Sequence, residues 1–197
     1  QLLDIALAKS SFEVQTEFSY PLAVKTICKA IGITCPDITW FKSRTKKLAD
    51  VLDLGYVPDA YAPGMDALND LIDYLKEQIA TRSSCLSDDL ISQLIKPLQD
   101  DASYNYNSSL SLLTQMLFAG QETVADSIGI SVHTFARHPE QLALLRNNPH
   151  LIDNAVKEIL RYDGPVQFTG SRAASEDIYI GDIKIAAGET TIIALGA

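Results

Sequence analysis

No stretch of this 197-residue sequence is apolar for long enough to cross a membrane, which takes about 20 consecutive apolar residues. The amino-terminal sequence Q-L-L-D-I-A-L-A-K also lacks the basic start and the long apolar stretch of a signal peptide. Both observations argue against membrane insertion and against secretion. We therefore expect a soluble, cytoplasmic protein with no membrane partner.

Basic residues are scarce as well. Lys and Arg total 16 against 25 Asp and Glu, which gives a net charge of -9, and the densest basic cluster is R-T-K-K at residues 44–47. A surface with this charge repels a phosphate backbone. The sequence therefore argues against nucleic acid as a partner.

Cysteine is rare and irregularly spaced. Cys28, Cys35 and Cys85 are odd in number, and they show neither C-x-x-C spacing nor an accompanying pair of histidines. Disulfide frameworks and zinc sites need such regular sets. We expect no metal site built from these residues, and a reducing compartment is the simpler setting.

What the sequence does contain is enough apolar residues, 47%, to bury one sizeable core. Apolar residues recur with helical spacing in most of the first 100 positions, and V-P-D-A-Y-A-P-G at residues 57–64 has the composition of a linker. Ser87, Asp88 and Asp89 provide a cap and an acidic first turn for a short helix that Pro97 should end. The predicted helices in this part are 2–17, 21–31 with Gly32 as its C-cap, 38–54, 65–82 and 90–96.

A long central helix is predicted from Ser109 to Arg137, after the polar segment 100–109. Its length of about 45 Å would cross a whole domain. Apolar residues cover nearly its entire circumference, which indicates burial on several sides. Pro139 should start another helix, and Asn148-Pro149 should separate it from a helix over 151–162.

After residue 163 the hydrophobic period changes. The segments 178–180, 183–185 and 190–195 are rich in β-branched residues and are separated by turn residues, which predicts a small meander of strands. The expected class is α+β and predominantly α-helical. We expect a single domain that is helical over 1–162 and β-rich over 163–197.

The sequence F-A-G-Q-E-T within the central helix combines residues unusual for a buried helix. Ala119, Gly120 and Thr123 should share one face, where the missing side chain of Gly120 would leave a hollow beside the Thr123 hydroxyl. That hydroxyl can bond the carbonyl one turn back and loosen or kink the helix, and Glu122 supplies an acid. Alternatively, Gly120 only permits close packing of another helix and Glu122 reaches solvent. The residues themselves leave both interpretations open.

A second candidate is E-I-L-R at residues 158–161, where Glu158 and Arg161 are three apart and can form an ion pair on a helix. Such a pair is common by chance, so its position matters more than its presence. It ends a helix shortly before D-G-P, and Arg172 follows in S-R-A-A-S-E-D.

Together these motifs resemble one family, the cytochrome P-450 heme-thiolate monooxygenases of the soluble bacterial type. The resemblance rests on A-G-Q-E-T, then F-A-R-H-P-E-Q-L-A-L-L-R-N-N-P, E-I-L-R, S-R-A-A-S-E-D and G-D-I-K-I-A-A-G-E-T in this order. It implies heme as cofactor, oxidation of a small organic substrate such as hydroxylation, and an electron-transfer protein as partner.

The resemblance also implies a role for each matching residue. Ala119 and Gly120 would pass over one face of the heme, and Glu122 and Thr123 would relay protons to dioxygen as catalytic residues. Arg172 would bind a heme propionate.

The ion pair of Glu158 and Arg161 would lock its helix near the other side of the heme. This role, too, is an implication of the family resemblance.

The family's iron ligand is a cysteine in a sequence F-x-x-G-x-x-x-C, which does not occur among these 197 residues. The first helices of the family's fold are missing as well, so we expect a truncated central segment that is inactive alone, either a fragment or one part of a split enzyme. A heme-free scaffold or oligomerisation module is the alternative, and an unrelated helical protein is a third. Exposed apolar surface should lead to self-association or binding of a partner chain.

Overall fold

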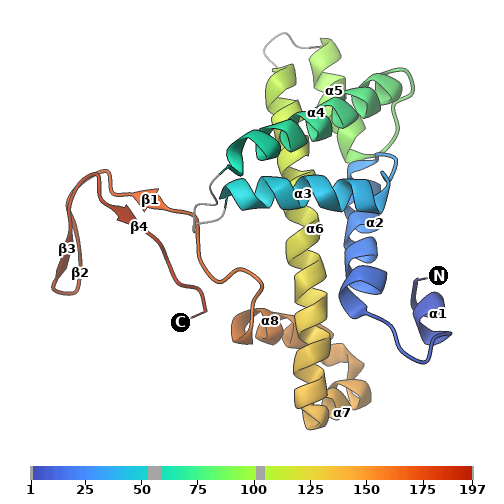
Figure 1. The fold of residues 1–197 in the computed structure, drawn as a ribbon, viewed down its shortest axis with the longest axis vertical. Coiled ribbons are helices and arrows are strands. Elements are labelled where there is room, and N and C mark those ends of the chain that lie inside the picture. The colour runs from blue at the N-terminus through green and yellow to red at the C-terminus, as the bar shows by residue number, and fades with distance from the viewer. Residues whose placement is uncertain (1, 53–58, 101–104, 197) are drawn as a thin grey trace. The chain divides into compact units, whose positions relative to one another are not determined.

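The computed structural model describes residues 2–52, 59–100 and 105–196, and the side chains of these residues except 52 and 97–100. The chain forms two compact units, Gln1–Asp126 and Ser127–Ala197. The boundary lies within one long helix, α6 (Tyr106–Arg137), which belongs to both units (Figure 1). None of the helices in the described ranges is long and apolar enough to span a membrane.

The first unit is helical, as predicted, and surrounds the first two thirds of α6. Its other elements are α1 (Leu2–Leu7), the π-helix η1 (Gln15–Ser19), α2 (Tyr20–Ile31), α3 (Ile38–Leu52), α4 (Tyr61–Ser83) and α5 (Leu90–Asp100). The core of this unit is formed by the apolar faces of its larger helices, which pack together. Fully buried members include Val24, Ile31, Phe41, Leu71, Leu75, Ile91, Leu113 and Leu117.

The helix predicted over 2–17 is interrupted. α1 ends at Leu7, and η1 starts at Gln15 and runs directly into α2. The carboxylate of Glu13 accepts the backbone N–H groups of Gln15 and Thr16, which caps a new helix start at this point. A local side-chain bond therefore overrides the ragged apolar pattern of the segment.

The predicted end of α2 is confirmed. Gly32 has a φ of 90°, and its N–H and that of Ile33 both donate to the carbonyl of Cys28, at 2.9 and 3.0 Å. A left-handed residue at this position favours glycine. Two such bonds satisfy a carbonyl that the end of the helix would otherwise leave unpaired.

Prolines stop helices less often here than the sequence analysis expected. α4 starts at Tyr61 and contains Pro63, which is tolerated because N–H groups in a first turn have no helical partner. α5 continues through Pro97 to Asp100, since one lost backbone bond does not end the ladder on either side. The remaining linker residues 57–58 and the polar residues 101–104 lie outside the described residues.

The helices α3 and α4 pack against each other through an aromatic contact. The rings of Trp40 and Tyr74 are 5.8 Å apart between centroids, and the guanidinium of Arg44 lies 4.9 Å from the Trp40 ring centroid. Arg44 also pairs with Asp70 at 3.0 Å. These contacts join α3 to α4.

The second unit contains the end of α6, then α7 (Pro139–Asn147), the short 3-10 helix η2 (Pro149–Leu151) and α8 (Ile152–Tyr162). These bounds agree with the predicted helices. Four strands follow: β1 (Arg172–Ala173), β2 (Ile178–Ile180), β3 (Ile183–Ile185) and β4 (Thr190–Thr191). The predicted α+β class with helix dominant is confirmed.

The strands pair differently from a sequential meander. β2 pairs with β3, and β1 pairs with β4, so that one hairpin is nested within the other (Figure 1). The register joins Ile178 to Ile185 and Arg172 to Thr191. β1 carries too few β-branched residues to be seen in the sequence, and it is extended because it pairs with β4.

Candidate active site

The A-G-Q-E-T residues lie on α6 within the first unit. Thr123 Oγ1 donates a hydrogen bond of 3.1 Å to the carbonyl of Ala119, which confirms the predicted bond to the preceding turn. Both side chains are exposed. The helix nevertheless remains a continuous α-helix from Tyr106 to Arg137, so the bond does not break it. The hydroxyl and a small side chain therefore share an exposed face of a continuous helix.

Gly120 is explained by packing. A β-carbon at this position would lie 2.8 Å from Cδ1 and 3.0 Å from Cγ1 of Ile27 on α2, closer than ordinary van der Waals contact. The space left by the missing side chain is thus occupied by Ile27, and it is not an open hollow beside Thr123. This contact supports the packing interpretation of Gly120. A heme-facing role for this residue stays a prediction.

Glu122 does not simply extend into solvent. Its carboxylate is half-buried, and burial, followed by the nearby Asp126 carboxylate, raises its pKa above the usual value. The ammonium groups of Lys46 and Lys42 on α3 act in the opposite direction but do not cancel this effect. An acid in this environment holds its proton to a higher pH than a free glutamate.

Asp126 adds a second half-buried carboxylate one turn further along α6. Burial raises its pKa, while a hydrogen bond from Gln15 Nε2 and the charge of Lys42 partly oppose the rise. Gln15 Oε1 is itself buried and has no partner among the described residues. The sequence analysis missed Asp126, although its spacing of four from Glu122 placed both acids on one helix face.

The predicted ion pair on α8 is present. Arg161 donates from Nε to Glu158 Oε2 at 2.7 Å and from Nη2 to Glu158 Oε1 at 2.6 Å. The hydrogen bonds lower the pKa of Glu158 and raise that of Arg161. Both side chains are well exposed, so this is a bidentate pair on a helix surface.

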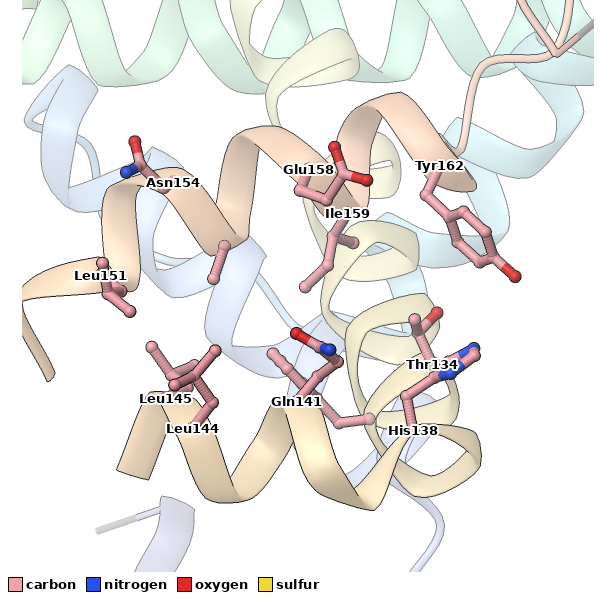
Figure 2. Close-up of a pocket in the computed structure, with 12 residues that line it drawn as sticks. Thr134, His138, Gln141, Leu144, Leu145, Leu151, Asn154, Glu158, Ile159 and Tyr162 are labelled. Atoms are coloured by element: carbon pink, nitrogen blue, oxygen red, sulfur yellow. The ribbon is translucent and has the colours of Figure 1, made fainter. Parts of the chain in front are cut away.

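A cavity of about 440 Å³ lies beside this pair in the second unit (Figure 2). The end of α6, α7, η2 and α8 form its walls, and Ile159 of α8 points toward Gln141 of α7. Most of the lining is apolar. Glu158 is the only predicted site residue that lines this cavity.

Arg172 lies in β1 and is exposed. Its Nη1 donates to the neighbouring Ser171 carbonyl at 3.2 Å, and among the described residues no carboxylate pairs with it. The guanidinium therefore has unused donors for an acidic group of a ligand.

The described residues include no cluster of three or more His, Cys, Asp or Glu side chains that could hold a metal ion. Cys28 is buried, Cys35 and Cys85 are exposed, and all three are free thiols.

Comparison with known proteins identifies the class. The sequence is 34% identical over 197 residues to Cytochrome P-450 CYP107DY1 from Priestia megaterium, covering all of this chain and 47% of that protein. It is 36% identical over 196 residues to the Biotin biosynthesis cytochrome P-450 of Bacillus subtilis, covering all of this chain and 49% of that protein. The crystal structure of P-450BioI in complex with an acyl carrier protein ligated to hexadec-9Z-enoic acid superposes with a TM-score of 0.89 at 35% identity, over 99% of this chain and 50% of that one.

The family profile described as Cytochrome P-450 matches residues 35–197. The chain therefore belongs to the cytochrome P-450 family, as the motif order indicated. It spans about half the length of the curated relatives that it matches.

Proposed function

We propose that this chain forms the oxygen-activating part of a heme-dependent monooxygenase that hydroxylates, or similarly oxidises, a small organic substrate. The observation that carries the proposal is that α6 holds, at consecutive positions, a half-buried acid of raised pKa, Glu122, and an exposed hydroxyl, Thr123. The iron ligand would come from sequence outside these 197 residues or from another chain.

The residues of α6 fit one face of a heme. Ala119 is small and exposed, so a flat group can approach the helix there, and the Thr123 hydroxyl lies one turn away on the same face. Arg172 would bind a propionate with its unpaired donors. When bound, heme would supply the iron at which dioxygen is reduced in this family.

The protein's own part in the chemistry is to hold and deliver protons. Glu122 retains a proton to higher pH than a free glutamate because it is partly buried beside Asp126. Thr123 would turn its Oγ1–H from the Ala119 carbonyl to the exposed face, donate that proton there, and regain a proton from Glu122 through water. Lys42 and Lys46 would keep Glu122 able to ionise again after each transfer.

A matched pair of substitutions on α6 tests this role in the protein that carries the complete fold. Thr123→Ala removes the exposed hydroxyl, and Ser131→Ala removes a comparable hydroxyl, whose Oγ donates to the Ser127 carbonyl at 2.6 Å. We expect Thr123→Ala to divert oxygen to hydrogen peroxide and to lower product per oxygen consumed by roughly 10-fold or more. Equal coupling in both variants would contradict the proposal.

Heme binding is tested separately by spectroscopic titration. Arg172→Ala should weaken heme affinity by about 10-fold, because a charge-assisted bond to a propionate is lost. Arg146→Ala removes an arginine in the last turn of α7 and serves as the control. No heme binding in any form of the protein, with an intact fold, would favour the heme-free scaffold instead.

The exposed apolar residues of α8 form a stripe that another segment or chain could cover. Ile152, Val156 and Leu160 follow each other at intervals of four, and each is about half exposed, at 51%, 49% and 48%. We propose that sequence completing the fold covers this stripe, with self-association as the alternative in its absence. Sedimentation of the chain with and without a complementary segment distinguishes the two cases. An electron-transfer protein would be the partner of the active enzyme.

A further inference from the structure

The side chain of Gln15 joins the segment before α2 to the middle of α6. Its Nε2 donates a hydrogen bond to Asp126 Oδ1, 111 positions further along the sequence. The backbone of Gln15 is fixed as well, because its N–H donates to the Glu13 carboxylate at 3.1 Å and its carbonyl accepts the N–H of Tyr20. The second of these bonds belongs to the π-helix η1, a rare geometry that is often found at functional sites. The amide of Gln15 is therefore held in place as a donor to Asp126.

The acceptor of this bond lies beside the proposed proton donor. Asp126 and Glu122 are four positions apart on the continuous helix α6, a spacing that places their β-carbons about 5–6 Å apart on one face. Both side chains are half-buried. Two carboxylates at this separation repel each other when both are ionised, so the second proton of the pair is harder to remove than the first. The surroundings of each carboxyl group decide which of them keeps that proton.

The hydrogen bond from Gln15 favours the ionised form of Asp126. An ionised carboxylate only accepts hydrogen bonds, and it is the N–H end of the amide that faces it. Burial raises the pKa of Asp126, and the bond from Gln15 is the largest effect that opposes this rise. Aspartate is also the stronger acid by itself, with a pKa of about 3.9 against about 4.3 for glutamate. Asp126 should therefore ionise first and leave the remaining proton on Glu122.

The charges of the neighbouring helices do not separate the two acids in the same way. Lys42 of α3 favours ionisation of both carboxyl groups, whereas Lys46 and Asp50 of this helix act on Glu122 in opposite directions. The Tyr20 phenol of α2 has a pKa raised by burial to about 12, so it is neutral wherever a carboxyl group titrates. The hydrogen bond from η1 is thus the contact that distinguishes one acid from the other.

We propose that Gln15 is a positioning residue, which keeps the proton of this carboxyl pair on Glu122 by holding Asp126 as the ionised partner. The inference rests on the proposed function of Glu122 as a proton donor. Gln15 acts only through Asp126, and it touches neither Glu122 nor a ligand in this role. Loss of its donor would shift part of the proton from Glu122 to Asp126, so Glu122 would be protonated over a narrower range of pH.

Carbon-13 NMR of the side-chain carboxyl groups tests the proposal in the protein with the complete fold, before heme is added. Glu122→Gln and Asp126→Asn identify the two signals. Gln15→Leu removes the donor, and the titration midpoint of Asp126 should then move to higher pH and that of Glu122 to lower pH. Gln78→Leu is the matched control. It removes another amide that bonds a distant segment, through Oε1 and the N–H of Thr34 at 2.9 Å, and should move neither midpoint.

A second variant separates this role from a structural one. Asparagine at position 126 can still accept the bond from Gln15 but carries no charge, so Asp126→Asn alone should lower the Glu122 midpoint. Adding Gln15→Leu to it should then cause no further shift. Unchanged midpoints in Gln15→Leu would overturn the proposal, and so would an equal shift with and without Asp126. The expected midpoints in a protein that forms no product would refute the proposed function and leave the effect of Gln15 on the pair in place.

Discussion

Two glutamates of this chain, Glu122 and Glu158, lie on helices at positions that the family motifs single out, and their surroundings are opposite. Glu122 is half-buried, has another carboxylate one turn away, and has a raised pKa. Glu158 is exposed, accepts hydrogen bonds from two nitrogens of the Arg161 guanidinium, and has a lowered pKa. The first environment favours the neutral acid and the second favours the carboxylate.

This difference agrees with the roles that we propose, a chemical one for Glu122 and a structural one for Glu158. A group that must give up and regain a proton needs a pKa moved toward the working pH, and burial provides this for Glu122. A permanently ionised partner of arginine needs the reverse. The two glutamates can be exchanged for glutamine to test this division.

The largest effect is expected for Glu122→Gln in the protein with the complete fold. Glutamine keeps the shape but carries no transferable proton, so product formation should fall by roughly 100-fold. Thermal unfolding should change little, because the substitution also removes a partly buried charge. Glu140→Gln, in the first turn of α7, is the control. An unchanged rate would remove Glu122 from the proton path.

The next effect concerns the helix on which Glu122 lies. Gly120→Ala should gain about 1 kcal/mol in helix propensity but lose about 2 kcal/mol by crowding Ile27, for a net loss of roughly 1 kcal/mol. In an Ile27→Val background the closest atom, Cδ1, is absent and only the γ-carbon contact at 3.0 Å remains, so the same change should cost less. Urea unfolding measures both, with Ser111→Ala on the exposed face of α6 as a propensity control. Equal effects in the two backgrounds would argue against the contact.

A smaller effect is expected from the lysines of α3. Lys42 and Lys46 lower the pKa of Glu122, so Lys46→Met should raise it further. Because the folded pKa of Glu122 is already above its unfolded value, its contribution to stability is present at low pH. That contribution is lost as pH rises from about 4.5 through the folded pKa. Stability measured against pH should show this window widen in the variant, whereas Lys25→Met on α2 should leave it unchanged.

The smallest effect is expected for Glu158→Gln. Its ion pair with Arg161 is fully exposed, and such pairs contribute little to stability. The melting temperature of the chain should stay within experimental error. A substantial drop would mean that Glu158 supports the adjacent cavity wall beyond its ion pair.

The sequence predicted most helices because their signals are local. The bounds of α2, α7 and α8 follow from Pro21, Gly32, Pro139 and the Asn148-Pro149 break, each of which acts on its own turn. β1 escaped prediction because its extended form depends on pairing with Thr190 and Thr191, far along the chain.

The same distinction applies to the candidate site. The bond from Thr123 to Ala119 and the pair of Glu158 with Arg161 lie within one helical turn, and both were predictable. The contact between Gly120 and Ile27 was not predictable, because the two residues are 93 positions apart in the sequence (120 − 27). The motif left two interpretations of Gly120 open, and the packing of α2 against α6 supports one of them.

The contact between Trp40 and Tyr74 gives this chain an internal optical reporter. Trp40 is the only tryptophan in the sequence, and its ring lies close to both a tyrosine of α4 and the guanidinium of Arg44. Its emission should therefore report separation of α3 from α4 without any added label. A single fluorophore at this junction allows refolding and ligand titration to be followed in one unmodified sample.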